Sequence, residues 1–128
     1  MGRRIKVDEK LAKKCLENVP LWATIQTLWY NHRRGACVLV ALYRLLNNYA
    51  DRAFHTSVVI RESLPLIEKY DKPVDPRNLT QTLRTLERQN LIVSATPFGK
   101  KRPHFWTLTS YGRVVAECII DLYLRRVD

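Results

Sequence analysis

The spacing of hydrophobic residues predicts helices in the first part of the chain. In residues 7–19 the apolar positions recur every fourth residue with lysines between them, which is typical of an amphipathic helix. Pro20 either ends this helix or begins the next one, whose apolar stripe covers residues 21–29. Gly35 interrupts the pattern, and a third helix is predicted over residues 36–48.

A short strand and a fourth helix are predicted next. Residues 53–55 are read as one small strand, after which Thr56 or Ser57 caps a helix, with Pro65 as a local irregularity. The inward face of this helix is expected to hold four apolar residues, Val59, Ile60, Leu64 and Ile67.

The clearest helix start in the chain is the pair Asp75-Pro76. Aspartate can accept hydrogen bonds from the free backbone N–H groups, and proline fits the first helical position without losing a hydrogen bond. The helix that follows has a leucine face, made by Leu79, Leu83 and Leu86. Its opposite face is basic and rich in amides, with Arg77, Gln81, Arg84 and Arg88 flanked by Asn78 and Thr85.

A hairpin and a last helix complete the pattern. Residues 91–96 and 104–109 are β-branched, apolar or alternating, and residues 97–103 between them form a turn. The tip of this hairpin is basic and consists of Gly99, Lys100, Lys101 and Arg102. Residues 110–126 are predicted to be helical, with an apolar surface so wide that it suggests burial on two sides.

Composition and charge narrow the class of protein. With 128 residues, of which 46% are hydrophobic, the chain is long enough for one compact domain and too apolar for intrinsic disorder. The net charge of +10 favours a polyanionic partner. The excess is concentrated in two blocks, because residues 1–34 and residues 75–113 each carry a net charge of +5.

Several functions are disfavoured by what the sequence lacks. It contains no nucleotide-binding, zinc-protease or nucleophile-elbow motif, so we do not expect an enzyme. Three cysteines and three histidines are far from one another in sequence, which argues against a disulfide framework and against a metal or other cofactor. We interpret all three cysteines, Cys15, Cys37 and Cys118, as reduced thiols on apolar helix faces.

No membrane segment or leader is expected. The longest mostly apolar run, residues 36–46, is interrupted by Arg44 and is shorter than the roughly 20 residues that cross a bilayer. Charged residues occupy the place where a signal peptide has its apolar stretch. We therefore expect a cytoplasmic protein that does not enter a membrane.

The predicted elements follow the order of a winged helix-turn-helix domain, which is helix, strand, helix, capped helix and hairpin. The three leucines of the capped helix, followed by Glu87 and Leu91-Ile92, are similar to the recognition helix and first wing strand of PadR-like and MarR-like transcriptional regulators. The run Phe105-Trp106-x-Leu108-Thr109-x-x-Gly112-Arg113, preceded by Arg102-Pro103, resembles their returning strand and the turn into the last helix. The layout matches over residues 36–126, and the detail only over the last forty or so.

This resemblance implies a mainly α fold with a small β-hairpin, in the α+β class. A winged helix core in residues 35–109 would lie between N-terminal helices in residues 1–34 and a C-terminal helix in residues 110–128, and the outer helices would form a homodimer. Trp22, Trp29 and Trp106 lie on apolar stripes, so we interpret them as core or interface anchors rather than base-stacking platforms.

The predicted function is sequence-specific binding of double-stranded DNA by a transcriptional regulator, with a repressor favoured. Residues near the start of the capped helix would reach base edges, and those farther along would touch phosphates. The hairpin tip would contact the backbone or enter a narrow minor groove. The candidate DNA-binding residues are Arg77, Asn78, Gln81, Arg84, Arg88, Lys100, Lys101 and Arg102.

An alternative keeps the fold and changes the partner. Winged helices also serve as protein-interaction modules or RNA-binding accessory domains, and the apolar end helices could dock a larger protein. The pattern identifies no small-molecule effector and no operator sequence.

Overall fold

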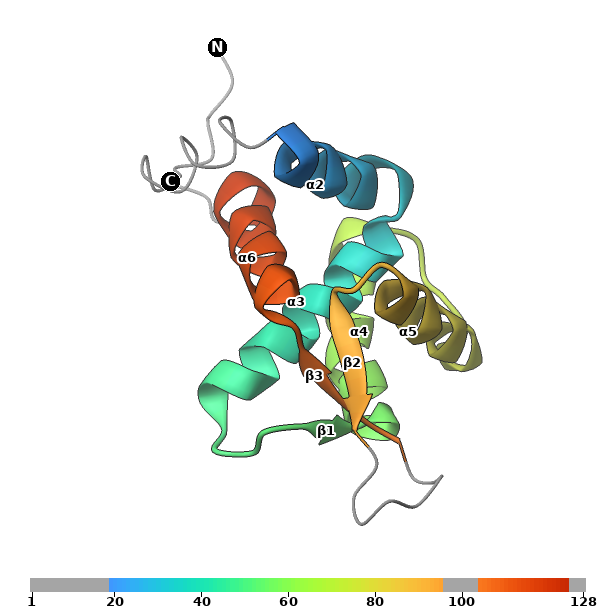
Figure 1. The fold of residues 1–128 in the computed structure, drawn as a ribbon. Helices are drawn as coiled ribbons and strands as arrows, with labels where there is room; N and C mark the ends of the chain where they lie inside the picture. Colours follow the sequence, from blue (N-terminus) through green and yellow to red (C-terminus); the bar gives the residue numbers. More distant parts are fainter. Residues whose placement is uncertain (1–18, 96–103, 125–128) are drawn as a thin grey trace.

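The computed structural model describes residues 19–95 and 104–124 of the chain (Figure 1). In this part the protein is mainly helical with a small antiparallel sheet. The elements in chain order are α2 (Val19–Asn31), α3 (Arg33–Asn48), β1 (Phe54–His55), α4 (Thr56–Tyr70), the 3-10 turn η1 (Pro76–Asn78), α5 (Leu79–Arg88), β2 (Ile92–Ala95), β3 (Phe105–Leu108), α6 (Ser110–Ile119) and the π-helical segment η3 (Ile120–Leu124). The predicted helix over residues 7–19 falls almost entirely outside the described residues.

Helix α3 is the centre of the core. It runs through the middle of the molecule and packs against α2, α4, α5 and α6, and its residues 35–42 are all buried (Figure 1). The predicted break at Gly35 is wrong, because α3 begins at Arg33 and includes this glycine in its first turn. A Cβ at Gly35 would lie 3.5 Å from Leu86 Cδ2, which is an ordinary van der Waals contact, so the packing of α5 here does not require glycine.

The strands form a three-stranded sheet with the order β1-β3-β2 within the described residues. β3 pairs antiparallel with both neighbours, placing Phe54 opposite Trp106 and Ile92 opposite Leu108. The predicted small strand and both hairpin strands are therefore confirmed. The hairpin turn, including its basic tip Lys100-Lys101-Arg102, lies outside the described residues.

The start of α4 differs from the expectation that Thr56 or Ser57 caps it. The cap is His55, whose Nδ1 accepts a hydrogen bond from the Ser57 backbone N–H at 3.1 Å. Thr56 is engaged elsewhere, since its hydroxyl accepts a hydrogen bond of 2.8 Å from Trp106 Nε1. The helix then continues through Pro65 to Tyr70, and Val59 and Ile67 are buried on its inner face.

Helix α5 ends in a turn that reverses the chain into β2. Asn90 has a left-handed backbone with φ of 61°, the Asn90 N–H donates to the Glu87 carbonyl at 3.0 Å, and the Leu91 N–H donates to the Leu86 carbonyl at 3.1 Å. These two bonds make a Schellman motif, in which asparagine is the usual substitute for glycine.

The start of α6 is fitted against this same turn. The Thr109 hydroxyl caps α6 by accepting from the Gly112 N–H at 2.8 Å and donates to the Asn90 carbonyl at 2.7 Å. The Thr109 N–H donates to the Leu91 carbonyl at 3.1 Å. A Cβ at Gly112 would lie 1.8 Å from the Leu91 oxygen, so only glycine allows this approach.

The last helix is less exposed and less regular than its pattern suggested. Regular α6 ends at Ile119, short of the predicted helix over residues 110–126, and a π-helical segment continues to Leu124. Four α6 side chains are buried within this chain, namely Val115, Ala116, Cys118 and Ile119. Three of them belong to the wide apolar surface, and Ala116 lies beside it. The half-buried apolar residues that remain are Val114, Ile120, Leu122, Tyr123 and Leu124.

The tryptophans have the core role predicted for them. Trp29 and Trp106 are buried, and Trp22 packs half-buried against the same core. Trp29 stacks on Tyr123, with 4.7 Å between ring centroids, which joins α2 to the end of the chain's last described segment. Cys37 and Cys118 are buried on helix faces, as expected, whereas Cys15 lies outside the described residues.

No helix in residues 19–95 or 104–124 combines the length and the apolar character needed to cross a membrane.

The contact at Gly112 predicts a specific loss of stability. Gly112→Ala should lower the free energy of unfolding by roughly 2 kcal/mol or more, because the methyl group would overlap a fixed backbone carbonyl. Urea denaturation followed by circular dichroism measures the change.

Gly35→Ala is the matched control. Its methyl group would make an ordinary contact 3.5 Å from Leu86 Cδ2 and would remove the flexibility of glycine within a helix. This variant should be as stable as the wild type or slightly more stable. Equal destabilisation by the two substitutions would contradict the role given to Gly112.

Candidate nucleic-acid interface

Helix α5 presents the two faces that its sequence predicts. Leu79, Leu83 and Leu86 are buried against the core. The predicted outer face is exposed to solvent, and its members are Arg77, Asn78, Gln81, Arg84 and Arg88. Five of the eight candidate residues are therefore gathered on one surface, and the other three belong to the hairpin tip outside the described residues.

The exposed surface of α5 consists of two adjacent stripes. At about 100° per residue, Arg84 and Arg88 point directly away from the buried leucines. A second stripe on one flank of the helix holds amides and hydroxyls, from Asn78, Thr82, Thr85 and Gln89. Gln81 lies between the stripes, so the outer face combines fixed positive charges with groups that both donate and accept hydrogen bonds.

Asp75 acts as a cap, but of the 3-10 turn η1 and not of α5 as predicted, since α5 begins at Leu79 and has no side-chain cap. Asp75 also binds a candidate residue. Asp75 Oδ1 accepts from the Arg77 N–H at 2.9 Å, and the Arg77 guanidinium pairs with the same carboxylate at 2.7 Å between Nη2 and Oδ2. These hydrogen bonds from Arg77 lower the pKa of Asp75 and raise the pKa of Arg77. In this structure the guanidinium therefore faces its own helix cap.

The hairpin is attached to α5 by Glu87. Its Oε2 accepts hydrogen bonds from the Ser94 hydroxyl at 2.8 Å and from the Ser94 N–H at 3.2 Å. Glu87 lies on the flank of α5 opposite the amide stripe, and Ser94 lies in β2. This contact fixes where the hairpin leaves the helix, a role that the sequence pattern did not reveal because it depends on the pairing of α5 with β2.

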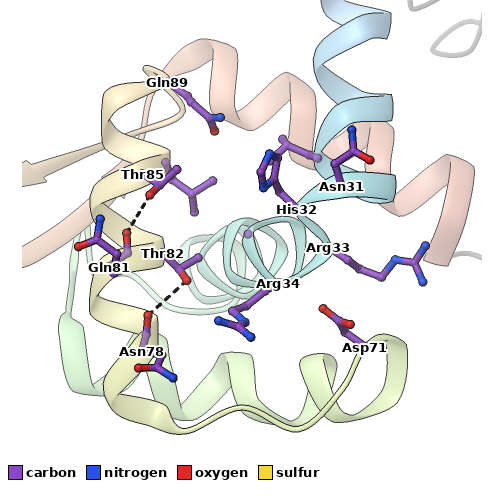
Figure 2. A pocket seen from close by; sticks show the side chains of 13 residues that line it. Asn31, His32, Arg33, Arg34, Asp71, Asn78, Gln81, Thr82, Thr85 and Gln89 are labelled. Atoms are coloured by element: carbon purple, nitrogen blue, oxygen red, sulfur yellow. Dashed lines mark hydrogen bonds between the residues drawn. The ribbon is translucent and has the colours of Figure 1, made fainter.

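A groove borders the amide stripe of α5. Its volume is about 510 Å³, and it lies between α5 and the corner where α2 meets α3. Figure 2 shows the side chains along it, with the first turn of α3 at its centre. The polar lining residues are Asn31, His32, Arg33, Arg34, Asp71, Asn78, Gln81, Thr82, Thr85 and Gln89.

The two arginines of this corner differ in what they contact. Arg33 donates to the backbone carbonyls of Trp29 at 2.9 Å and Tyr70 at 3.2 Å, and its guanidinium lies 4.5 Å from the centre of the Trp29 ring. Arg34 is half-buried, and within residues 20–94 and 104–124 no acceptor pairs with its guanidinium. Figure 2 shows Arg34 pointing into the space bordered by Asn78 and Asp71, whereas Arg33 points away from α5.

The described residues contain no group of three or more His, Cys, Asp or Glu side chains that could hold a metal ion. The histidines lie in separate environments. His55 caps α4, and His104 has a buried Nδ1 for which the described residues supply no hydrogen-bond partner.

Comparisons of the chain with protein-family models, curated proteins and solved structures gave no match.

The Glu87 contact predicts a local effect on the hairpin. Glu87→Ala should lower the free energy of unfolding by about 1–2 kcal/mol, because two hydrogen bonds to a carboxylate are lost. It should also speed hydrogen exchange of the Ser94 amide, measured by NMR.

Glu68→Ala removes an exposed carboxylate of α4 and serves as the control. It should change neither quantity appreciably. An unchanged Ser94 exchange rate in Glu87→Ala would contradict the attachment described above.

Proposed function

We propose that this chain is a winged helix-turn-helix protein that binds double-stranded DNA in a sequence-specific way and regulates transcription, with repression favoured. The observation that carries this proposal is α5. It is held to the core by three buried leucines, and its opposite face presents arginines and amides beside an attached hairpin. The element order and the sheet order β1-β3-β2 support the same fold.

Helix α5 has the shape and chemistry needed to read a major groove. That groove is about 12 Å wide and admits one helix, and glutamine and asparagine make paired hydrogen bonds to adenine there. Asn78 and Gln81 are exposed near the start of the helix, where such residues usually reach base edges. Arg84 and Arg88 follow along the helix and would contact phosphates.

Arg77 has a more restricted role than its position alone suggests. Its guanidinium is held by Asp75 at 2.7 Å, so contact with guanine requires that it leave or share this carboxylate. We therefore expect Gln81 and Asn78 to contribute more to base preference than Arg77.

The hairpin tip is proposed to make the backbone or minor-groove contact. Its residues Lys100, Lys101 and Arg102 follow β2, and the Glu87 contact sets the direction in which β2 leaves α5. A basic tip in this place would add to affinity on any sequence.

A homodimer is proposed to form through α2 and η3. Much of α6 is already buried within one chain. The candidate surface therefore consists of residues of α2 and η3, namely half-buried Trp22, Leu122 and Tyr123 and the 63% exposed Tyr30. Tyr30 also contacts Tyr123 edge-to-face, with 5.8 Å between centroids. Two-fold symmetry would place two α5 helices about 34 Å apart and predict a pseudo-palindromic site.

The DNA-binding proposal is tested by substitutions on α5. Gln81→Ala should relax base preference at one position of the site, at a cost of about 1–3 kcal/mol for the preferred sequence. Arg84→Ala should weaken binding to all sequences and reduce the slope of log affinity against log salt by about one. Titrations of duplexes selected from a random pool measure both effects.

Arg44→Ala is the control for net charge. Arg44 is exposed on the latter part of α3, which lies on the other side of the molecule from α5 (Figure 1). Equal losses from Arg84→Ala and Arg44→Ala would indicate binding by overall charge alone. Equal affinity for duplex, single strands and structured RNA would favour the alternative of an RNA-binding accessory domain.

The dimer is tested by sedimentation at micromolar concentration. The wild type should have twice the mass of one chain, and Tyr30→Glu should shift it towards the monomer. Tyr49→Glu is a matched control, since Tyr49 is 62% exposed at the end of α3, away from α2 and η3. A monomeric wild type would remove the dimer from the proposal.

A further inference from the structure

Helix α5 has different neighbours on its two flanks. On the side of Glu87 it is bound to the hairpin through Ser94, and on the side of Asn78, Thr82 and Thr85 it borders the groove at the α2-α3 corner. The arginine stripe lies between these flanks and points away from the core. A DNA major groove is bordered by two phosphate backbones, so a helix inserted in it meets one backbone on each flank.

The basic tip is the contact proposed for the backbone on the hairpin side, and Arg84 and Arg88 lie between the two flanks. The other flank borders the groove. This groove is open beside α5, has a volume of about 510 Å³, and combines amides and hydroxyls of α5 with cationic groups of the α2-α3 corner. Side chains of this kind are the usual partners of phosphodiester oxygens.

Of the two arginines in the corner, Arg34 is the one that can bind a ligand. The Arg33 guanidinium is occupied by two backbone carbonyls and by the Trp29 ring. The Arg34 guanidinium has no acceptor among the described residues and points into the groove (Figure 2). The residue is half-buried, and its side chain borders the α5 flank of the groove.

Asp71 is the one groove-lining carboxylate in the described part of the chain. It lies close to the arginine corner in Figure 2 and would oppose an approaching phosphate. Asp71 therefore allows the charge of the ligand to be tested. Removal of its negative charge should strengthen the binding of an anion and should not strengthen the binding of a neutral or cationic ligand.

We infer that this groove receives the phosphodiester backbone of the DNA strand on the flank of α5 away from the hairpin, with Arg34 as its cationic contact. The inference rests on the proposed function, since it assigns a second part of the same DNA interface. The proposed DNA interface then has three parts, namely α5, the hairpin and the groove. Helix α5 would lie between the two phosphate backbones that border the major groove.

The experiment compares substitutions with opposite expected signs. Arg34→Gln, which keeps most of the aliphatic stem, should weaken duplex binding about fivefold at physiological ionic strength and reduce the salt slope by about one. Arg34→Lys should retain most of the affinity. Asp71→Asn should strengthen binding and leave base preference unchanged.

The position of the contact is tested with duplexes in which single phosphates are replaced by neutral methylphosphonates. One replacement beyond the edge of the base-contact region should weaken the wild type and have no further effect on Arg34→Gln. Thermal unfolding of each variant establishes that it is folded before its affinity is compared.

The results separate this inference from the proposed function. If Arg84→Ala weakens binding while Arg34→Gln has wild-type affinity and salt slope, the groove contact is overturned and the DNA-binding proposal stands. If no variant of α5 or of the groove changes duplex affinity, both are overturned.

Discussion

The close approach of Gly112 to the Leu91 carbonyl is the constraint on which the arrangement of α5, the hairpin and α6 depends. Backbone atoms of three segments meet at this point, namely the end of α5, Leu91 just before β2, and the first turn of α6. Thr109 donates two hydrogen bonds across the same junction, from its hydroxyl to the Asn90 carbonyl and from its N–H to the Leu91 carbonyl. Since backbone atoms cannot move aside as side chains do, this contact limits how α6 can lie against the turn that joins α5 to β2.

Two further contacts hold α5 at its other surfaces. Glu87 binds the hairpin on one flank, and Leu79, Leu83 and Leu86 are buried against the core beneath. These contacts hold the buried face of α5 on the core and leave its polar face towards solvent. Such an arrangement suits the base contacts that we propose for α5, because a mobile helix would lose conformational entropy on binding.

Much of the fold follows from local signals in the sequence. The leucine spacing specified the buried face of α5, which is as predicted because amphipathicity acts within one segment. Asp75-Pro76 specified a helical start, which is the 3-10 turn η1, and α5 itself begins three residues later than predicted, at Leu79. The errors have tertiary causes. The cap of α4 moved to His55 because the Thr56 hydroxyl is bound by Trp106, about fifty residues later in sequence. The groove at Arg34 was missed because it exists only where α3 meets α5, and Arg77 was assigned to bases without its Asp75 partner.

Burial of Cys37 near the start of α3 has a consequence for the chemistry of this protein. Removal from water, followed by the negative charge of Asp71, raises the pKa of this thiol to about 12. At neutral pH only about one molecule in 10⁵ carries the thiolate, which is the form that attacks disulfides, peroxides and alkylating reagents. The central helix thus contains a thiol that oxidants reach only when the core itself opens, and its rate of labelling reports how often that happens.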